Sequence, residues 1–161
     1  MEKFQELRES AKERIKIADH ILTMTYPLVK DPKLLLVVLE NVFLALTNAL
    51  SSLLYYERVF KRIPPFHDNF VSKFQLFKER CVRRYKIDKE YLTVIKEVKD
   101  IILFHKNSPV EFVKNDRFVI CSEDYQLKTI SYEQVKDYIK KAKLFIELIS
   151  QILSKNESIF K

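Results

Sequence analysis

The chain has no glycine among its 161 residues, and this absence constrains its fold more than any other feature. Glycine adopts positive φ at the least cost, and it closes many helices and two-residue hairpins. Without glycine, Asn, Asp and Pro are left to make the turns, which favours a few long elements over a sheet with many tight turns. The absence also excludes the glycine-rich loops that bind phosphate in many nucleotide-dependent enzymes.

Apolar residues recur at steps of three and four along most of the chain, which is the spacing of one helical face. The pattern predicts helices over residues 2–29, from about 32 to 63, from 68 through KERCVRRYK, from 88 through His105, and over 132–154. Asp31 and Asp88 suit caps for the second and fourth helices. Ser131 followed by Gln134 forms a capping box for the last. The sequence therefore predicts an all-α fold, an antiparallel bundle of about five helices.

The composition changes in RFVICSEDYQLKTI, just before the last helix. Two β-rich runs, around Phe118 and Ile120 and around Leu127 and Ile130, flank the polar stretch SED. This pattern predicts a short β-hairpin, which needs a surface to pack against. Because the length suits one core and no low-complexity linker divides the chain, we expect a single domain over 1–161.

The second predicted helix is apolar around most of its circumference between residues 34 and 54. Polar residues, including asparagines and serines, interrupt the run, which argues against a bilayer span. We therefore expect no membrane contact, and we expect this helix to be buried by its own bundle or by a partner subunit. The second alternative predicts a homodimer, with Asn48 setting the register. The interface residues would include Leu34, Val38, Asn41 and Asn48.

Cysteine usage and the N-terminus indicate where the protein works. Cys81 and Cys121 lie far apart, with no other Cys or His at ligand spacing, so we expect neither a metal site nor a disulfide scaffold. The N-terminal stretch MEKFQELRESAKERIK has no apolar segment of the signal-peptide type. We expect a cytoplasmic protein without a cofactor. The sequence also contains none of the common catalytic motifs.

The charge balance favours a polyanionic partner. The net charge is +7 and the isoelectric point is about 9.3, which makes affinity for RNA plausible on electrostatic grounds. Within KERCVRRYK, Arg83 and Arg84 either stabilise the end of the third helix or form part of an RNA-binding surface. Tyr85 beside them could stack on bases.

The stretch FHKNSPVEF, residues 104–112, interrupts the helical pattern with polar residues. Ser108, Pro109 and Glu111 fit the start of a helix. That interpretation leaves His105, Lys106 and Asn107 unexplained: they would lie where one helix ends and the next begins, and free N–H groups there could bind an anion.

The pair Lys106–Asn107, placed between two late helices of a compact bundle, resembles the polar segment of the HEPN superfamily. That family's motif is an arginine, often followed by Asn, with a histidine four to six residues further on. In this chain Glu111 or Phe112 stands where that histidine would be. The resemblance implies a dimeric helical protein that binds RNA or nucleotides, and the missing histidine implies no robust nuclease activity.

Two alternatives stay open from the sequence. One is a non-enzymatic homodimeric interaction module built on the apolar second helix. The other, the least favoured, is a metal-independent ribonuclease that uses Arg62 and His67 in RIPPFH, since a Pro-Pro turn could bring those two side chains together.

Overall fold

The computed structural model describes residues 1–159 and is mainly helical, which confirms the mostly-α class. The chain begins with one continuous helical stretch made of α1 (Lys3–His20), the π-helical turn η1 (Ile21–Thr25) and α2 (Tyr26–Val29). The remaining elements are α3 (Leu34–Val59), α4 (Phe70–Leu76), the π-helical turn η2 (Phe77–Cys81), α5 (Val82–Arg84), α6 (Glu90–Lys106), β1 (Val110–Lys114), β2 (Arg117–Cys121), β3 (Leu127–Ile130) and α7 (Tyr132–Ile159).

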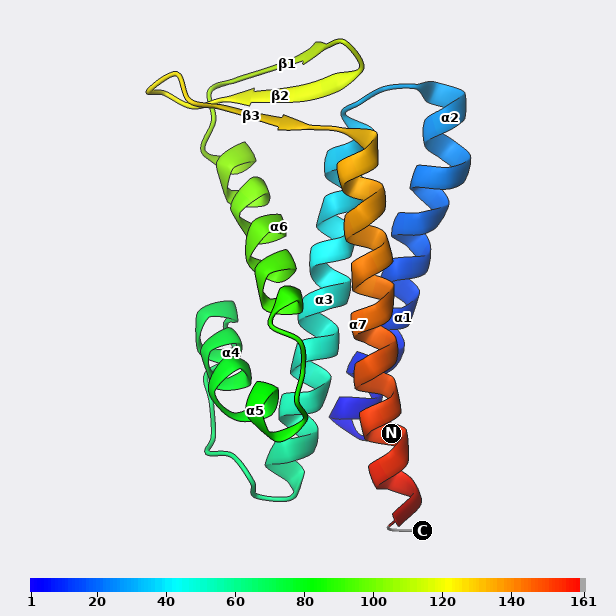
Figure 1. Ribbon diagram of the computed structural model, residues 1–161, viewed down its shortest axis with the longest axis vertical. Helices are drawn as coiled ribbons and strands as arrows, with labels where there is room; N and C mark the ends of the chain where they lie inside the picture. Colours follow the sequence, from blue (N-terminus) through cyan, green and yellow to red (C-terminus); the bar gives the residue numbers. More distant parts are fainter. Residues whose placement is uncertain (160–161) are drawn as a thin grey trace.

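Helix α3 lies at the centre and contacts α1, α6 and α7. Figure 1 shows α1 and α6 running toward the small sheet, whereas α3 and α7 run away from it. The sheet lies across one end of the long helices, and α4 and α5 lie beside α3 toward the other end (Figure 1). The two ends therefore carry different kinds of structure.

The apolar sequence of α3 follows from this central position. Residues that face its neighbours are fully buried, among them Val38, Leu39 and Leu46. By length and composition α3 could also cross a membrane, since its most apolar window has a mean hydropathy of 1.9, and 56% of that window is buried inside the protein. Core helices of this kind pass the same test, so the expectation of no membrane contact stays a prediction.

Three side chains predicted as caps accept backbone hydrogen bonds near helix starts, although the residues at the cap positions of α3 and α6 are Lys33 and Lys89. Asp31 Oδ1 accepts a hydrogen bond from Lys33 N at 3.0 Å, and Asp88 Oδ1 accepts one from Glu90 N at 2.9 Å. Ser131 Oγ accepts a hydrogen bond from Gln134 N at 3.2 Å. These bonds satisfy backbone donors that a helix leaves unpaired in its first turn.

Several predicted boundaries were wrong. The second helix, α3, ends at Val59 instead of near residue 63. Helix α4 begins at Phe70, because Asn69 is its cap and accepts a hydrogen bond from Ser72 N at 2.9 Å, while Asp68 pairs with a lysine. The last helix continues to Ile159 rather than ending near 154.

The prediction that Asn, Asp and Pro make all the turns was also incomplete. Lysines adopt the left-handed conformation where three helices end: Lys30, Lys61 and Lys86 have φ of 54°, 55° and 53°. A lysine at a helix C-terminus interacts favourably with the exposed carbonyls, which partly offsets the cost of this conformation. Asn115 and Asp116 make the turn of the β1–β2 hairpin at φ of 52° and 60°.

Within residues 1–159 the sheet has three antiparallel strands in the order β1-β2-β3, one more than the predicted hairpin. The predicted pair is β2 and β3, with Phe118 opposite Ile130. The added strand is β1, which pairs with β2 from Val110 opposite Cys121 to Lys114 opposite Arg117. The inner face of the sheet buries Phe118, Ile120 and Ile130 completely, so the hairpin has the packing surface that it needs.

The strand β1 replaces the helix start predicted at Ser108. The Ser108 side chain does not cap a new helix; its hydroxyl donates to Phe104 O at 2.6 Å, at the end of α6. Pro109 then favours extended backbone before it, and the β-branched residues that follow pair with β2. The helix start was predicted from neighbouring residues alone, whereas the strand forms because its backbone pairs with β2.

Candidate functional site

The most completely buried charged side chain described in the structure is Glu57, near the end of α3. Its exposed fraction is 1%. A buried carboxylate is costly unless it is paired and hydrogen-bonded. Glu57 meets this requirement with two arginines and a tyrosine, and we call Glu57, Arg62, Arg84 and Tyr85 the Glu57 cluster.

The two arginines of the Glu57 cluster come from different parts of the chain. Arg84 Nη1 lies 2.7 Å from Glu57 Oε2, and Arg62 Nη1 lies 3.8 Å from Glu57 Oε1. The Arg62 guanidinium also lies over the Phe60 ring, 5.2 Å from its centroid. The side chains of Arg84 and Arg62 are still 44% and 34% exposed. Glu57 therefore brings two partly exposed arginines together at the surface.

Tyr85 and Cys81 complete the surroundings of Glu57. The Tyr85 hydroxyl donates a hydrogen bond to Glu57 Oε1. Burial, followed by this hydrogen bond and the negative charge of Glu57, raises the pKa of Tyr85. Burial, with a smaller contribution from Glu57, raises the pKa of the Cys81 thiol to about 12. Both groups therefore stay protonated at neutral pH, and Cys81 is not an activated nucleophile.

The Glu57 cluster joins two basic stretches of the chain. Residues 57–62 and 78–89 contain nine Lys or Arg and three acidic residues, a formal charge of +6 out of +7 for the whole chain. We call these two stretches the basic end. It lies far from the sheet, where α3 ends beside α5 (Figure 1).

Four site residues predicted from the sequence lie in the basic end or close to it in the chain: Arg62, Arg83, Arg84 and His67. Arg62 and Arg84 meet at Glu57, and Arg83 is exposed beside them. His67 is exposed in the loop between α3 and α4, and no ion pair of its side chain occurs within residues 1–159. The structure thus brings Arg62 together with Arg84, not with His67.

The predicted anion site at His105, Lys106 and Asn107 has a different structure from the expected one. His105 Nδ1 pairs with Glu111 Oε1 from β1. The chain enters β1 directly after this segment and does not start a helix there, so the helix N-terminus that was to bind the anion is absent. That part of the prediction was wrong, because the chain continues as a strand. Lys106 is exposed at the end of α6.

The residues predicted to form a homodimer interface on α3 are largely engaged within the chain. Val38 is fully buried, and Leu34 is partly buried. Asn48 Nδ2 donates to Ser10 Oγ at 3.0 Å, and Asn41 Oδ1 accepts from Arg14 Nη1 at 3.4 Å. Asn48 therefore pairs α3 with α1 of the same chain. These intrachain contacts do not test whether the protein forms a homodimer, which stays a prediction.

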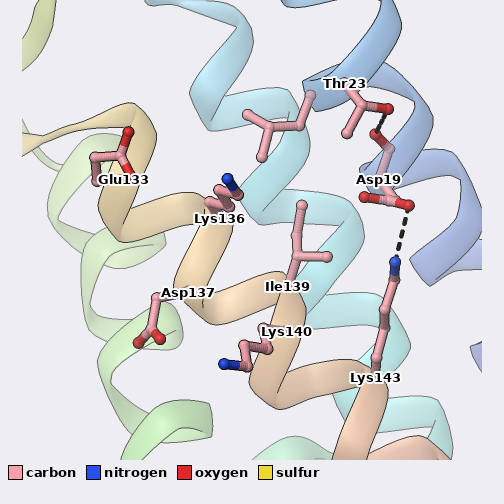
Figure 2. A pocket seen from close by; sticks show the side chains of 9 residues that line it. Asp19, Thr23, Glu133, Lys136, Asp137, Ile139, Lys140 and Lys143 are labelled. Carbon is pink, nitrogen blue, oxygen red and sulfur yellow. Dashed lines mark hydrogen bonds and ion pairs between the residues drawn. The ribbon is translucent and has the colours of Figure 1, made fainter.

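A groove runs between α1 and α7. It holds two cavities of about 490 and 610 Å³. Both are lined by Asp19 and Lys143, whose carboxylate and ammonium meet across the groove at 2.8 Å (Figure 2). Buried apolar side chains line the groove below this ion pair: Ile15, Leu22, Ile139 and Ile146.

The groove has no clear ligand preference. Its lining mixes lysines with acidic residues, and Figure 2 shows Glu133 and Asp137 on the same helix as Lys136 and Lys140. The ion pair between Asp19 and Lys143 also divides the groove. In the described part of the chain, no group of three His, Cys, Asp or Glu side chains could hold a metal ion. The Glu57 cluster is therefore the better candidate site.

No family model, curated protein or solved structure matches the chain. The resemblance to the HEPN superfamily stays a prediction.

Glu57, the residue that organises the site, was not among the site residues predicted from the sequence. A signal was present: Glu57 follows a strongly apolar run and precedes Arg58, Lys61 and Arg62. An acidic residue on the buried face of a helix requires cationic partners. The partner in α5, however, is 27 positions away, and its identity depends on the tertiary fold.

Proposed function

We propose that this chain is a basic helical-bundle protein that binds single-stranded RNA at the basic end and has no nuclease activity. The observation that carries the proposal is the shared contact of Arg62 and Arg84 with Glu57, which joins two basic stretches at one surface.

The geometry suits phosphate groups. A guanidinium has five N–H donors, so a contact with Glu57 leaves most of the donors of each arginine for a ligand. Because Glu57 already restricts both side chains, less conformational entropy is lost when a phosphate binds. Exposed Arg80 and Arg83 add positive charge beside them, and counterion release would then favour binding.

An aromatic side chain at the same surface favours single strands. Phe60 is 37% exposed and lies beside Arg62. Unpaired bases stack on aromatic rings and on guanidinium planes, whereas the bases of a duplex are already stacked. We therefore propose single-stranded rather than duplex RNA as the ligand class.

The absence of nuclease activity is part of the proposal. Cleavage of RNA without a metal requires a general base or nucleophile near the phosphate. The thiol of Cys81 and the phenol of Tyr85 both have raised pKa values. Metal-independent cleavage that disappears in His67→Ala would contradict this part.

The first test measures binding as a function of salt. A fluorescein-labelled single-stranded RNA of mixed sequence is titrated with protein, and anisotropy is recorded from about 50 to 200 mM salt. Replacing Arg80 and Arg83 together by Gln should weaken binding and reduce the salt slope by about 1.4, since each lost phosphate contact on a single strand contributes about 0.7.

The matched control is Lys140→Gln on α7, which removes one exposed charge outside the basic end. It should reduce affinity far less and leave the slope nearly unchanged. A wild-type protein without affinity at low salt would overturn the proposal, and so would equal losses in the control and the double variant.

A second variant tests whether the guanidinium group of Arg84 contacts the RNA. Arg84→Lys keeps the charge but loses the planar fork. We expect affinity to fall about three- to tenfold with a similar salt slope, because the electrostatic contribution is retained. Unchanged affinity would show that Arg84 acts only on Glu57.

A further inference from the structure

The strand β1 forms an open edge of the sheet. It pairs with β2 on one side, and within residues 1–159 no other strand pairs with it. All five of its residues are exposed. An edge of this kind presents unpaired backbone groups that can pair with another strand.

The hairpin turn indicates which backbone groups are unpaired. Lys114 and Arg117 flank a two-residue loop with positive φ at both positions, the signature of a type I′ turn. The pair that closes such a turn exchanges two hydrogen bonds, and every second pair along the ladder does the same. Phe112 and Val110 therefore bond to β2. The N–H and C=O groups of Glu111 and Val113 point away from β2, toward the open edge.

The outer face of the sheet is also apolar beside this edge. Val110 and Phe112 lie on the face opposite to the buried Phe118 and Ile120, as the register shows. They are 51% and 40% exposed, and Leu127 on the same face is 61% exposed. Exposed apolar residues grouped in this way mark interaction surfaces.

We propose that this edge binds a second copy of the chain, with β1 of each copy antiparallel to the other and Phe112 at the two-fold axis. In this register Glu111 pairs with Val113 of the partner subunit and Val113 pairs with the partner's Glu111. Each of these two pairs exchanges both backbone hydrogen bonds. The sheets of the two copies then form one continuous six-stranded sheet.

The side chains of β1 suit this register. Phe112 faces the partner's Phe112 in a non-hydrogen-bonded pair, where side chains approach most closely and aromatic pairs are favourable. Lys114 lies opposite the partner's Val110, and its alkyl stem can cover that side chain. Glu111 and Lys114 lie on opposite faces of the sheet, and in this register neither of them lies directly opposite a like charge of the partner subunit.

A cysteine pair tests the register directly. In a Cys121→Ser background, Phe112→Cys places two thiols opposite each other at a Cα distance of about 4.5 Å, which a disulfide can bridge. Under mild oxidation we expect a covalent dimer. Val110→Cys is the matched control, since that residue lies on the same face and is more exposed but faces Lys114 of the partner subunit. Equal cross-linking of both variants would overturn the register.

A proline variant tests the edge without breaking the hairpin. Val113→Pro removes an N–H that β2 does not use, and proline is tolerated on edge strands. Sedimentation at about 100 μM should show a wild-type dimer with a dissociation constant in the micromolar range, weakened at least tenfold in Val113→Pro but not in Val113→Ala. Circular dichroism verifies that both variants are folded. A monomeric wild type at this concentration, or a dimer that persists in folded Val113→Pro, would overturn the proposal.

Discussion

Three lysines occupy backbone conformations that glycine normally takes. Each lies where a helix ends, and each side chain remains exposed. A non-glycine residue at positive φ costs about 1–2 kcal/mol. Lys30, Lys61 and Lys86 each bear this cost at a helix end, so glycine substitutions at these positions offer a direct test.

We expect Lys30→Gly to stabilise the protein by about 0.5 kcal/mol. Relief of the left-handed conformation is favourable, and the greater freedom of glycine in the unfolded chain removes part of the gain. Lys16→Gly, in the middle of α1, should instead destabilise by about 1 kcal/mol. Urea unfolding measures both, and a loss of stability in Lys30→Gly would contradict the strain argument.

Glu57→Gln examines the buried carboxylate. The amide keeps the shape of the side chain but weakens the contacts with both arginines and with Tyr85, so we expect a loss of about 1–3 kcal/mol. The exposure of Arg62 and Arg84 limits the loss, since water can solvate both guanidinium groups. Glu147→Gln at the exposed rim of the α1–α7 groove should change stability by less than about 0.5 kcal/mol. Similar effects of the two substitutions would show that Glu57 has no special role.

Cys81 predicts a loss of stability in alkali. Its folded pKa of about 12 exceeds the ordinary value of 9.0, so the folded state favours the protonated thiol. This contribution is complete below pH 9 and is lost as pH rises from 9 toward 12. Unfolding midpoints at pH 8 and pH 10.5 should therefore differ more in the wild type than in Cys81→Val. Because the pKa of Tyr85 is also raised, both proteins should lose some stability in alkali. An equal or larger difference between the two midpoints in Cys81→Val would contradict the contribution of Cys81.

At the scale of elements, the segment after α6 shows how a local signal can be overruled. Ser108 and Pro109 are typical of a helix start, yet the chain forms β1. Pairing with β2 satisfies backbone groups along the strand, and the contact between His105 and Glu111 connects β1 to the end of α6. A strand requires a partner, and that partner begins only at Arg117.

Helix α3 shows the opposite case, in which the sequence pattern was sufficient for the element but not for its surroundings. Its apolar character predicted burial, and α1, α6 and α7 of the same chain provide it. Asn48, predicted to set the register of a dimer, donates a hydrogen bond to Ser10 within the chain, and its role in a dimer stays a prediction. We therefore place the proposed self-association on β1, where the backbone is open.

At the scale of the whole molecule, the two proposals concern opposite ends. The basic end lies where α3 meets α5, and the sheet covers the other end of the long helices (Figure 1). A two-fold pairing of sheets would leave the basic end of each copy exposed. The proposals can therefore fail separately: Val113→Pro should leave RNA affinity per chain unchanged at concentrations where both proteins are monomeric, and the Arg80 and Arg83 double variant should still dimerise.

The sequence by itself determined the mostly helical class, the approximate extents of the long helices and three side chains that accept backbone hydrogen bonds near helix starts. These features depend on contacts within a few residues, such as the repeat of apolar positions and the bond from Asp88 to Glu90 N. Only the tertiary structure decided that β1 is a strand and that Glu57 holds Arg62 and Arg84. Pairing in a sheet and the neutralisation of a buried charge depend on partners brought together by folding, and a local pattern carries no information on which distant residue will arrive there.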